Sequence, residues 1–140
     1  MAFSNPSREK RRELLQEAKT IAVVGLSNKP DRTSYMIADA LQRVGYKIIP
    51  VNPTIDEGLG EKAVASLTDI KEHVDIVNVF RRSEQVMPVA EEAVKIKAGT
   101  LWLQQGIYNE EAAKLAEENG LNVVMDLCIK VDHALLIPRK

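Results

Sequence analysis

The sequence predicts an α/β fold: a parallel, Rossmann-like sheet of about five strands with helices on both faces. Short apolar runs alternate with amphipathic segments of ten to fifteen residues along most of the chain. The runs are mostly apolar and rich in β-branched residues and do not alternate with polar ones, which is typical of parallel strands buried on both faces. A chain of 140 residues is the size of one domain. We therefore predict one doubly wound domain over residues 1–140, with right-handed crossovers.

The first predicted element is an amphipathic helix near the N-terminus. Asn5 can cap this helix, and Pro6 suits its first helical position. The side away from its apolar stripe carries four basic side chains, Arg8, Lys10, Arg11 and Arg12. We interpret these side chains as a solvated helix face.

Apolar runs at residues 20–24 and 47–51 predict the first two strands. Apolar side chains at helical spacing predict a helix between them, and Gly45 ends it. Proline lacks the N–H that a sheet interior uses, so Pro50 should lie near an end of its strand or at a bulge.

The same alternation predicts three more strands, over residues 75–80, 100–103 and 121–125. Ser83 and Asn109 can cap the helices between them, and a short final helix should follow Asp126. Residues 53–66 form the least regular stretch, for which we expect a mobile loop and a short extra strand at 63–65.

Composition excludes several classes of protein. The net charge of −1 argues against a general nucleic-acid binder, which needs a basic surface. A single cysteine allows no intrachain disulfide and suits a reducing compartment. The N-terminus lacks the apolar run of a signal peptide, and no segment is apolar enough to span a membrane. We therefore expect a cytoplasmic protein without nucleic-acid or membrane partners.

The ends of the predicted strands carry the candidate binding residues. In an open α/β sheet, ligands bind beyond the carboxyl ends of the strands, where the strand order reverses. The residues at these ends are Gly25, Leu26, Ser27, Asn52, Pro53, Phe80, Arg81, Arg82, Gln104, Gln105, Gly106 and Asp126. Two adjacent arginines among them favour a ligand that carries phosphate.

The loop after the first strand has the features of a phosphate-binding loop. Gly25 allows the backbone to approach a ligand closely. Thr33 and Ser34 stand at a helix start, where free N–H groups and the helix dipole attract anions. Lys29 and Arg32 add positive charge. The simpler alternative is a polar loop followed by an ordinary capped helix.

The absence of two common nucleotide-binding motifs narrows the range of candidate ligands. The loop has one glycine, so the dinucleotide fingerprint G-x-G-x-x-G is absent, and there is no Walker A motif. Asn52 stands after the second strand, where a nicotinamide-nucleotide site usually has a carboxylate for the ribose. The loop thus favours a phosphorylated adenine nucleotide that is not bound as in a standard NAD or ATP site.

Several motifs in order resemble the small bacterial and archaeal CoA-binding proteins. The motifs lie at residues 23–35, 45–53, 60–67, 74–82, 102–106 and 124–128. That family is similar to the CoA-binding half of the succinyl-CoA synthetase α subunit. The synthetase's phosphorylated histidine lies in a second domain that has no counterpart here. The resemblance therefore implies binding of coenzyme A and not catalysis.

The resemblance also implies where each part of coenzyme A lies. Residues expected around the diphosphate are Gly25, Ser27, Lys29, Arg32, Ser34 and Tyr35. Those expected by the adenosine and on the opposite wall are Asn52, Pro53, Phe80, Arg81 and Arg82. The segment expected near the pantetheine arm is Gln104, Gln105 and Gly106. The chain departs from the family's usual pattern at Thr54, Leu127 and Asp132.

Other functions stay open at this point. The chain could be an NAD(P)-binding oxidoreductase, or an acyl-CoA-processing enzyme that requires a partner subunit. Cys128 could be a nucleophile, although a lone cysteine between apolar residues more often packs in a core. Trp102 fits a core or an oligomer contact, and a homodimer or an unknown protein partner is possible. The histidines and the cysteine show no metal-site spacing.

Overall fold

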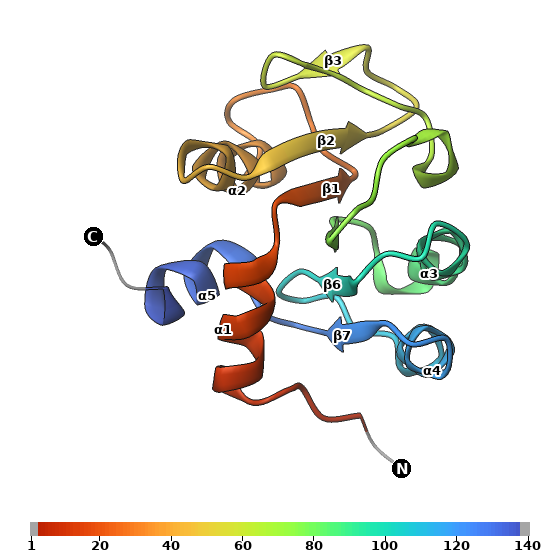
Figure 1. The fold of residues 1–140 in the computed structure, drawn as a ribbon. Helices are drawn as coiled ribbons and strands as arrows, with labels where there is room; N and C mark the ends of the chain where they lie inside the picture. The colour runs from red at the N-terminus through yellow and green to blue at the C-terminus, as the bar shows by residue number, and fades with distance from the viewer. Residues whose placement is uncertain (1–2, 138–140) are drawn as a thin grey trace.

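The computed structural model describes residues 3–137, in which a parallel sheet alternates with helices (Figure 1). The strands of the main sheet are β1 (Thr20–Val24), β2 (Lys47–Val51), β5 (Ile76–Val79), β6 (Thr100–Leu103) and β7 (Asn122–Val124). The α-helices are α1 (Arg8–Glu17), α2 (Thr33–Arg43), α3 (Val86–Lys95), α4 (Glu110–Glu118) and α5 (Ile129–Leu136). The five strands predicted for the main sheet and the predicted helices are all present, with ends shifted by a few residues at most.

The sheet has the order β2-β1-β5-β6-β7, and all neighbouring strands are parallel. From β1 the chain moves outward to β2, whereas from β5 it moves the other way to β6. The order therefore reverses between β1 and β5. This arrangement confirms the predicted doubly wound, Rossmann-like fold, and it puts the expected crevice beside the carboxyl ends of these two strands.

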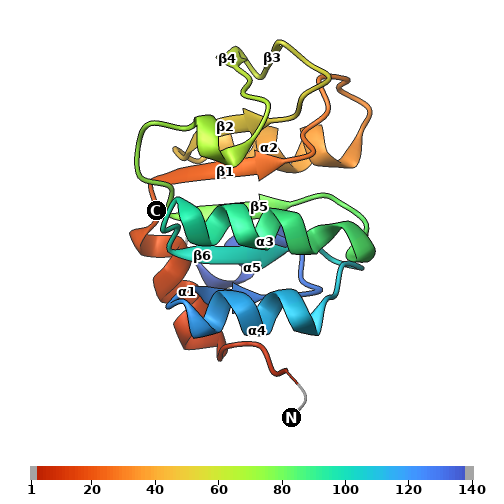
Figure 2. The same cartoon turned by 90° about the vertical axis from the view of Figure 1, so that its right-hand side faces the viewer.

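Each face of the sheet packs against its own layer of helices. Figure 1 shows α3 and α4 on one side and α1, α2 and α5 on the other. In Figure 2, β5 and β6 run beside and behind α3, β1 lies above them, and the carboxyl ends of these strands point to the right. Alternate side chains of each strand enter the two cores, which explains the uninterrupted apolar runs. Within residues 3–137, no helix is both long and apolar enough to cross a membrane.

The start of the first helix differs from the prediction. Ser7 caps α1 by accepting a hydrogen bond from the Lys10 N–H at 3.1 Å. The Asn5 amide instead exchanges two hydrogen bonds, of 2.9 and 2.8 Å, with the backbone of Met125 just beyond β7. The prediction of Asn5 as the cap was wrong because serine also caps helices well, and Asn5 has a tertiary partner that sequence spacing does not show.

The predicted solvated face of α1 also needs a correction. Arg11 forms an ion pair of 2.7 Å with Asp132 of α5, and only 13% and 8% of the two side chains are exposed. Its guanidinium donates a second hydrogen bond, of 2.7 Å, to the Pro6 carbonyl. One of the four basic residues therefore joins two helices, while Arg8, Lys10 and Arg12 are exposed.

Pro50 lies in the edge strand β2. Its carbonyl accepts a hydrogen bond of 3.0 Å from the Val64 N–H, and Val64 makes a single parallel bridge to Val51. The extra strand expected at residues 63–65 is reduced to this bridge. The irregular stretch instead contains a small hairpin of β3 (Glu57–Gly58) and β4 (Glu61–Lys62).

The helix after β5 starts later than predicted. Ser83 begins a short 3-10 turn, Ser83–Gln85, and α3 follows it directly. The Ser83 hydroxyl accepts a hydrogen bond from the Tyr108 N–H at 3.0 Å and does not cap α3. By contrast, Asn109 caps α4 as predicted, because its side chain accepts a hydrogen bond of 3.0 Å from the Ala112 N–H.

Candidate functional site

The carboxyl ends of β1 and β5 touch at Gly25. The Phe80 N–H donates a hydrogen bond of 2.8 Å to the Val24 carbonyl, and the Gly25 N–H donates one of 2.9 Å to Val51. Gly25 has a φ of +88°, a conformation that side chains rarely allow. These contacts fix the start of the β1–α2 loop at the switch point, between β2 on one side and β5 on the other.

The β1–α2 loop is held by its own serines. The Ser34 hydroxyl accepts a hydrogen bond of 3.0 Å from the Ser27 N–H, and the Ser27 hydroxyl accepts one of 3.1 Å from the Lys29 N–H. The Arg32 N–H donates a hydrogen bond of 3.0 Å to the Lys29 carbonyl. Residues seven positions apart are thus drawn together, so the loop has a defined shape without the glycines of a dinucleotide fingerprint.

The first amides of α2 have no acceptors among residues 3–137. Arg32 occupies the N-cap position without a side-chain hydrogen bond, and the first internal bond runs from the Met36 N–H to its carbonyl at 3.0 Å. The N–H groups of Thr33, Ser34 and Tyr35 precede that bond. Three amides and the positive end of the helix dipole can together attract an anion.

Four cationic side chains follow the carboxyl ends of β1 and β5: Lys29, Arg32, Arg81 and Arg82. Lys29, Arg32 and Arg82 are exposed, and Arg81 is partly buried. In the described part of the chain, no carboxylate lies within ion-pair distance of any of the four. Several other cations do have carboxylate partners. Among the described residues, these four side chains therefore form no salt bridge.

Asn52 connects the loops that follow β1 and β2. Its amide nitrogen donates a hydrogen bond of 3.0 Å to the Leu26 carbonyl, and its oxygen accepts bonds from the N–H and hydroxyl of Thr54 at 2.9 and 2.7 Å. Pro53 between them is exposed. The Asn52 side chain thus holds the two loops in register, a role that the sequence did not indicate.

The segment after β6 is divided between core and surface. The Gln104 side chain is buried, and its oxygen accepts a hydrogen bond of 3.3 Å from the Ile129 N–H at the start of α5. Gln105 and Gly106 are exposed, and the Gly106 N–H donates a hydrogen bond of 2.7 Å to the Asp126 carboxylate. This turn is therefore fixed to the end of β7.

Leu26 and Trp102 belong to the hydrophobic core. Leu26 has no exposed surface, and its carbonyl accepts the hydrogen bond from Asn52. Trp102 is also fully buried, and its indole N–H donates a hydrogen bond of 2.9 Å to the Leu127 carbonyl. Of the two interpretations of Trp102, the core one is confirmed.

Cys128 and His133 have separate surroundings. Cys128 occupies the N-cap position of α5 and packs partly buried against the core. His133 contacts the edge of the Tyr46 ring, with 5.6 Å between the ring centroids, and burial lowers its pKa. Within the described residues, no group of three potential metal ligands occurs. These contacts favour packing roles for both residues.

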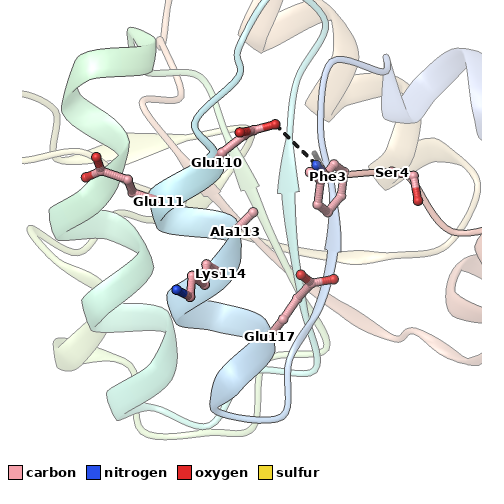
Figure 3. Close-up of a pocket in the computed structure, with 7 residues that line it drawn as sticks. All are labelled: Phe3, Ser4, Glu110, Glu111, Ala113, Lys114 and Glu117. Atoms are coloured by element: carbon pink, nitrogen blue, oxygen red, sulfur yellow. Dashed lines mark hydrogen bonds between the residues drawn. The ribbon is translucent and has the colours of Figure 1, made fainter. Parts of the chain in front are cut away.

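A separate hollow of about 560 Å³ lies between the N-terminal segment and α4 (Figure 3). It is lined by Phe3, Ser4, Glu110, Glu111, Ala113, Lys114 and Glu117. The Glu110 carboxylate accepts hydrogen bonds from the Tyr108 hydroxyl and, with a smaller effect, from the Phe3 N–H, and these bonds lower its pKa. Three carboxylates against one lysine make this hollow unsuited to a phosphate ligand.

The doubly wound sheet places this protein in the Rossmann-like class of α/β domains. More specifically, the chain belongs to the CoA binding domain family, whose sequence model matches residues 19–134. This match confirms the resemblance inferred from the ordered motifs.

Two relatives match nearly the whole chain. YneT of Bacillus subtilis (strain 168) is 60% identical over 133 residues, which are 95% of this chain and 98% of that protein. The solved structure of a hypothetical protein from Pyrococcus horikoshii OT3 is 36% identical, with a TM-score of 0.92. That match covers 99% of this chain and all of the other, so the whole architecture is shared.

A third relative is a much longer enzyme. The 4-hydroxybutyrate–CoA ligase (ADP-forming) of Nitrosopumilus maritimus is 30% identical over 125 residues. The match covers 81% of this chain but only 18% of the ligase. The chain thus corresponds to a small part of that enzyme.

Proposed function

We propose that this protein binds coenzyme A or an acyl-CoA at the carboxyl ends of the strands, as a cytoplasmic carrier, sensor or regulatory module without catalysis of its own. The observation that carries the proposal is the β1–α2 loop at the switch point, with unpaired amides and, among the described residues, four nearby cations that form no salt bridge. Membership of the CoA binding domain family supports the choice of ligand.

In this proposal the diphosphate lies against the start of α2. The free amides of Thr33, Ser34 and Tyr35 face its oxygens, Gly25 and Ser27 of the loop lie beside it, and Lys29 and Arg32 add charge. Each hydrogen bond to a charged group contributes about 1.5–3 kcal/mol, so two or three are sufficient to anchor the diphosphate.

The other parts of the ligand extend to both sides of this anchor. The adenosine lies by Asn52 and Pro53, and Phe80, Arg81 and Arg82 form the opposite wall. The pantetheine arm runs toward Gln104, Gln105 and Gly106. Because both atoms of the Asn52 amide already have partners within the protein, we expect this residue to shape the site rather than to bind the ribose.

The structure gives less support to the alternative of a nicotinamide cofactor. The side chain after β2 is the amide of Asn52, with its hydrogen bonds already made, and not a carboxylate that could accept bonds from ribose hydroxyls. For an acyl-CoA-processing activity, the support is the match to the ligase. Since the chain corresponds to 18% of that enzyme, we propose the binding step alone.

Calorimetry with CoA, acetyl-CoA, NAD and ATP, side by side on the purified protein, tests this function. We expect CoA or acetyl-CoA to bind more tightly than NAD or ATP. Tighter binding of NAD than of CoA would overturn the proposal, as would the absence of binding by both CoA compounds. Mass spectrometry of small molecules released from the denatured protein provides an independent check, in which we expect a CoA species.

A further inference from the structure

Asn78 is a polar residue at the centre of the sheet. It lies in β5, paired with Val23 of β1 and Trp102 of β6, and none of its surface is exposed. Its side-chain oxygen is a buried polar atom without a hydrogen-bond partner among residues 3–137. A buried acceptor left without a partner costs about 1–3 kcal/mol, so this position needs an explanation.

The direction of the Asn78 amide follows from its donor contacts. The amide nitrogen faces β6, where it lies 3.4 Å from the Trp102 carbonyl and 3.4 Å from the Gln104 side-chain oxygen. The oxygen is bonded to the same carbon but points in a different direction from the nitrogen, so it does not share these contacts.

The Gln104 side chain, which contacts this amide, makes only long hydrogen bonds. Gln104 contacts both Asn78 and the Ile129 N–H at the start of α5, at 3.4 and 3.3 Å, which are long for hydrogen bonds. The neighbouring anchors of α5 are shorter: 2.9 Å from the Trp102 indole to Leu127, and 2.7 Å from Arg11 to Asp132. The hydrogen bonds of Gln104 are therefore weaker than those that hold α5 to the rest of the fold.

We infer that Asn78 is an additional subsite, in which its free oxygen accepts a hydrogen bond from a secondary amide N–H in the arm of the ligand. This inference rests on the proposed function, because the pantetheine arm of CoA carries two such amides. Gln104 closes the subsite in the ligand-free chain and turns aside when the arm enters. The adenosine and phosphates make no contact with Asn78.

The test separates the arm from the nucleotide. Asn78→Leu keeps the branched shape of the side chain and removes its polar atoms, so we expect the melting temperature to be unchanged or higher. We expect this variant to bind CoA about tenfold more weakly, equivalent to about 1.4 kcal/mol. It should bind adenosine 3′-phosphate 5′-diphosphate, the nucleotide half alone, as tightly as the original protein.

A matched control is Asn122→Leu. Asn122 lies at the amino end of β7, far from the carboxyl ends of the strands where the ligand is proposed to bind. We expect it to bind both ligands normally. The subsite would be overturned if Asn78→Leu lost equal affinity for the two ligands, or lost affinity for neither. Unchanged affinity for both is the result expected if a buried water alone occupies the position. If the original protein binds neither ligand, the proposed function itself fails.

A second measurement does not depend on the folding of the variant. The side-chain amide signal of Asn78, followed by NMR in the original protein, should shift when CoA is added but not when the nucleotide half is added. Identical responses to the two ligands would contradict the inference.

Discussion

A β-carbon placed on Gly25 would lie 2.5 Å from the carbonyl oxygen of Phe80. The end of β1 and the end of β5 are therefore in direct backbone contact at the point where the strand order reverses. No side chain fits between them, so the β1–α2 loop and the Arg81–Arg82 pair start from a common, fixed position.

Gly25→Ala should destabilise the protein strongly. The change combines a left-handed φ of +88°, which costs about 1–2 kcal/mol for a residue with a side chain, with the collision against Phe80. Gly120→Ala is the matched control, because Gly120 also has a φ of +88° but no atom within 4 Å of its added carbon. Urea unfolding should show a larger loss for Gly25→Ala than for Gly120→Ala. Equal losses would show that the contact with Phe80 is not restrictive.

Arg81→Ala should weaken CoA binding more at low salt than at high salt. Salt screens the attraction between the guanidinium and a phosphate, so the charge contributes less when salt is already present. We expect a loss of about tenfold or more in low salt, the equivalent of one charged hydrogen bond. Arg43→Ala is the control, since Arg43 is exposed at the end of α2 and pairs with Asp39 at 3.1 Å. Equal losses at both salt concentrations would count against a phosphate contact.

Asp132→Asn should unfold at a clearly lower urea concentration than the original protein. Removing the carboxylate leaves the Arg11 charge largely buried without its partner, which costs about 3–5 kcal/mol in a buried pair. Asp39→Asn breaks the exposed pair with Arg43 and should cost under about 0.5 kcal/mol. The double variant Arg11→Met, Asp132→Leu should be more stable than Asp132→Asn. If Asp132→Asn and Asp39→Asn lose the same amount of unfolding free energy, the α1–α5 ion pair does not stabilise the fold.

Alkaline pH should remove a contribution of Tyr46 to stability. Burial raises the pKa of Tyr46 to about 12 in the folded protein, and its hydroxyl donates a hydrogen bond to the Leu15 carbonyl. Above pH 10 the unfolded chain releases this proton first, so the stabilisation is complete below pH 10 and is lost as pH rises toward 12. The loss amounts to roughly 2–3 kcal/mol.

The comparison with Tyr46→Phe isolates this effect from the titration of other groups. The difference in unfolding free energy between the two proteins should be constant below pH 10 and should shrink between pH 10 and 12. A difference that stays constant up to pH 12 would mean that the hydroxyl is not buried in solution.

Strand and helix positions were largely predictable from the sequence because they depend on local patterns. The run at residues 20–24 is apolar after Thr20 and is followed by Gly25, and β1 has these same bounds. Asn109 caps α4 as its position indicated. Errors arose where a polar side chain has a distant partner: Asn5 binds Met125, and Ser83 binds Tyr108.

The candidate site was only partly predictable for the same reason. Leu26 and Gln104 stand at strand ends, where the sequence suggests exposed side chains, yet both side chains are buried. The unpartnered side-chain oxygen of Asn78 was not predicted, although an asparagine inside the apolar run at residues 76–79 is a visible signal. Sequence alone does not show whether such a residue has a partner, because Trp102 and Gln104 are more than twenty positions away.

The sequence by itself determined the fold class, the order of the elements and the family, because apolar periodicity, caps and motifs are properties of neighbouring residues. Only the tertiary structure decided the strand order, the contact between Gly25 and Phe80, and which polar side chains have partners. These features depend on residues that are far apart in the chain and meet only when both faces of the sheet are packed.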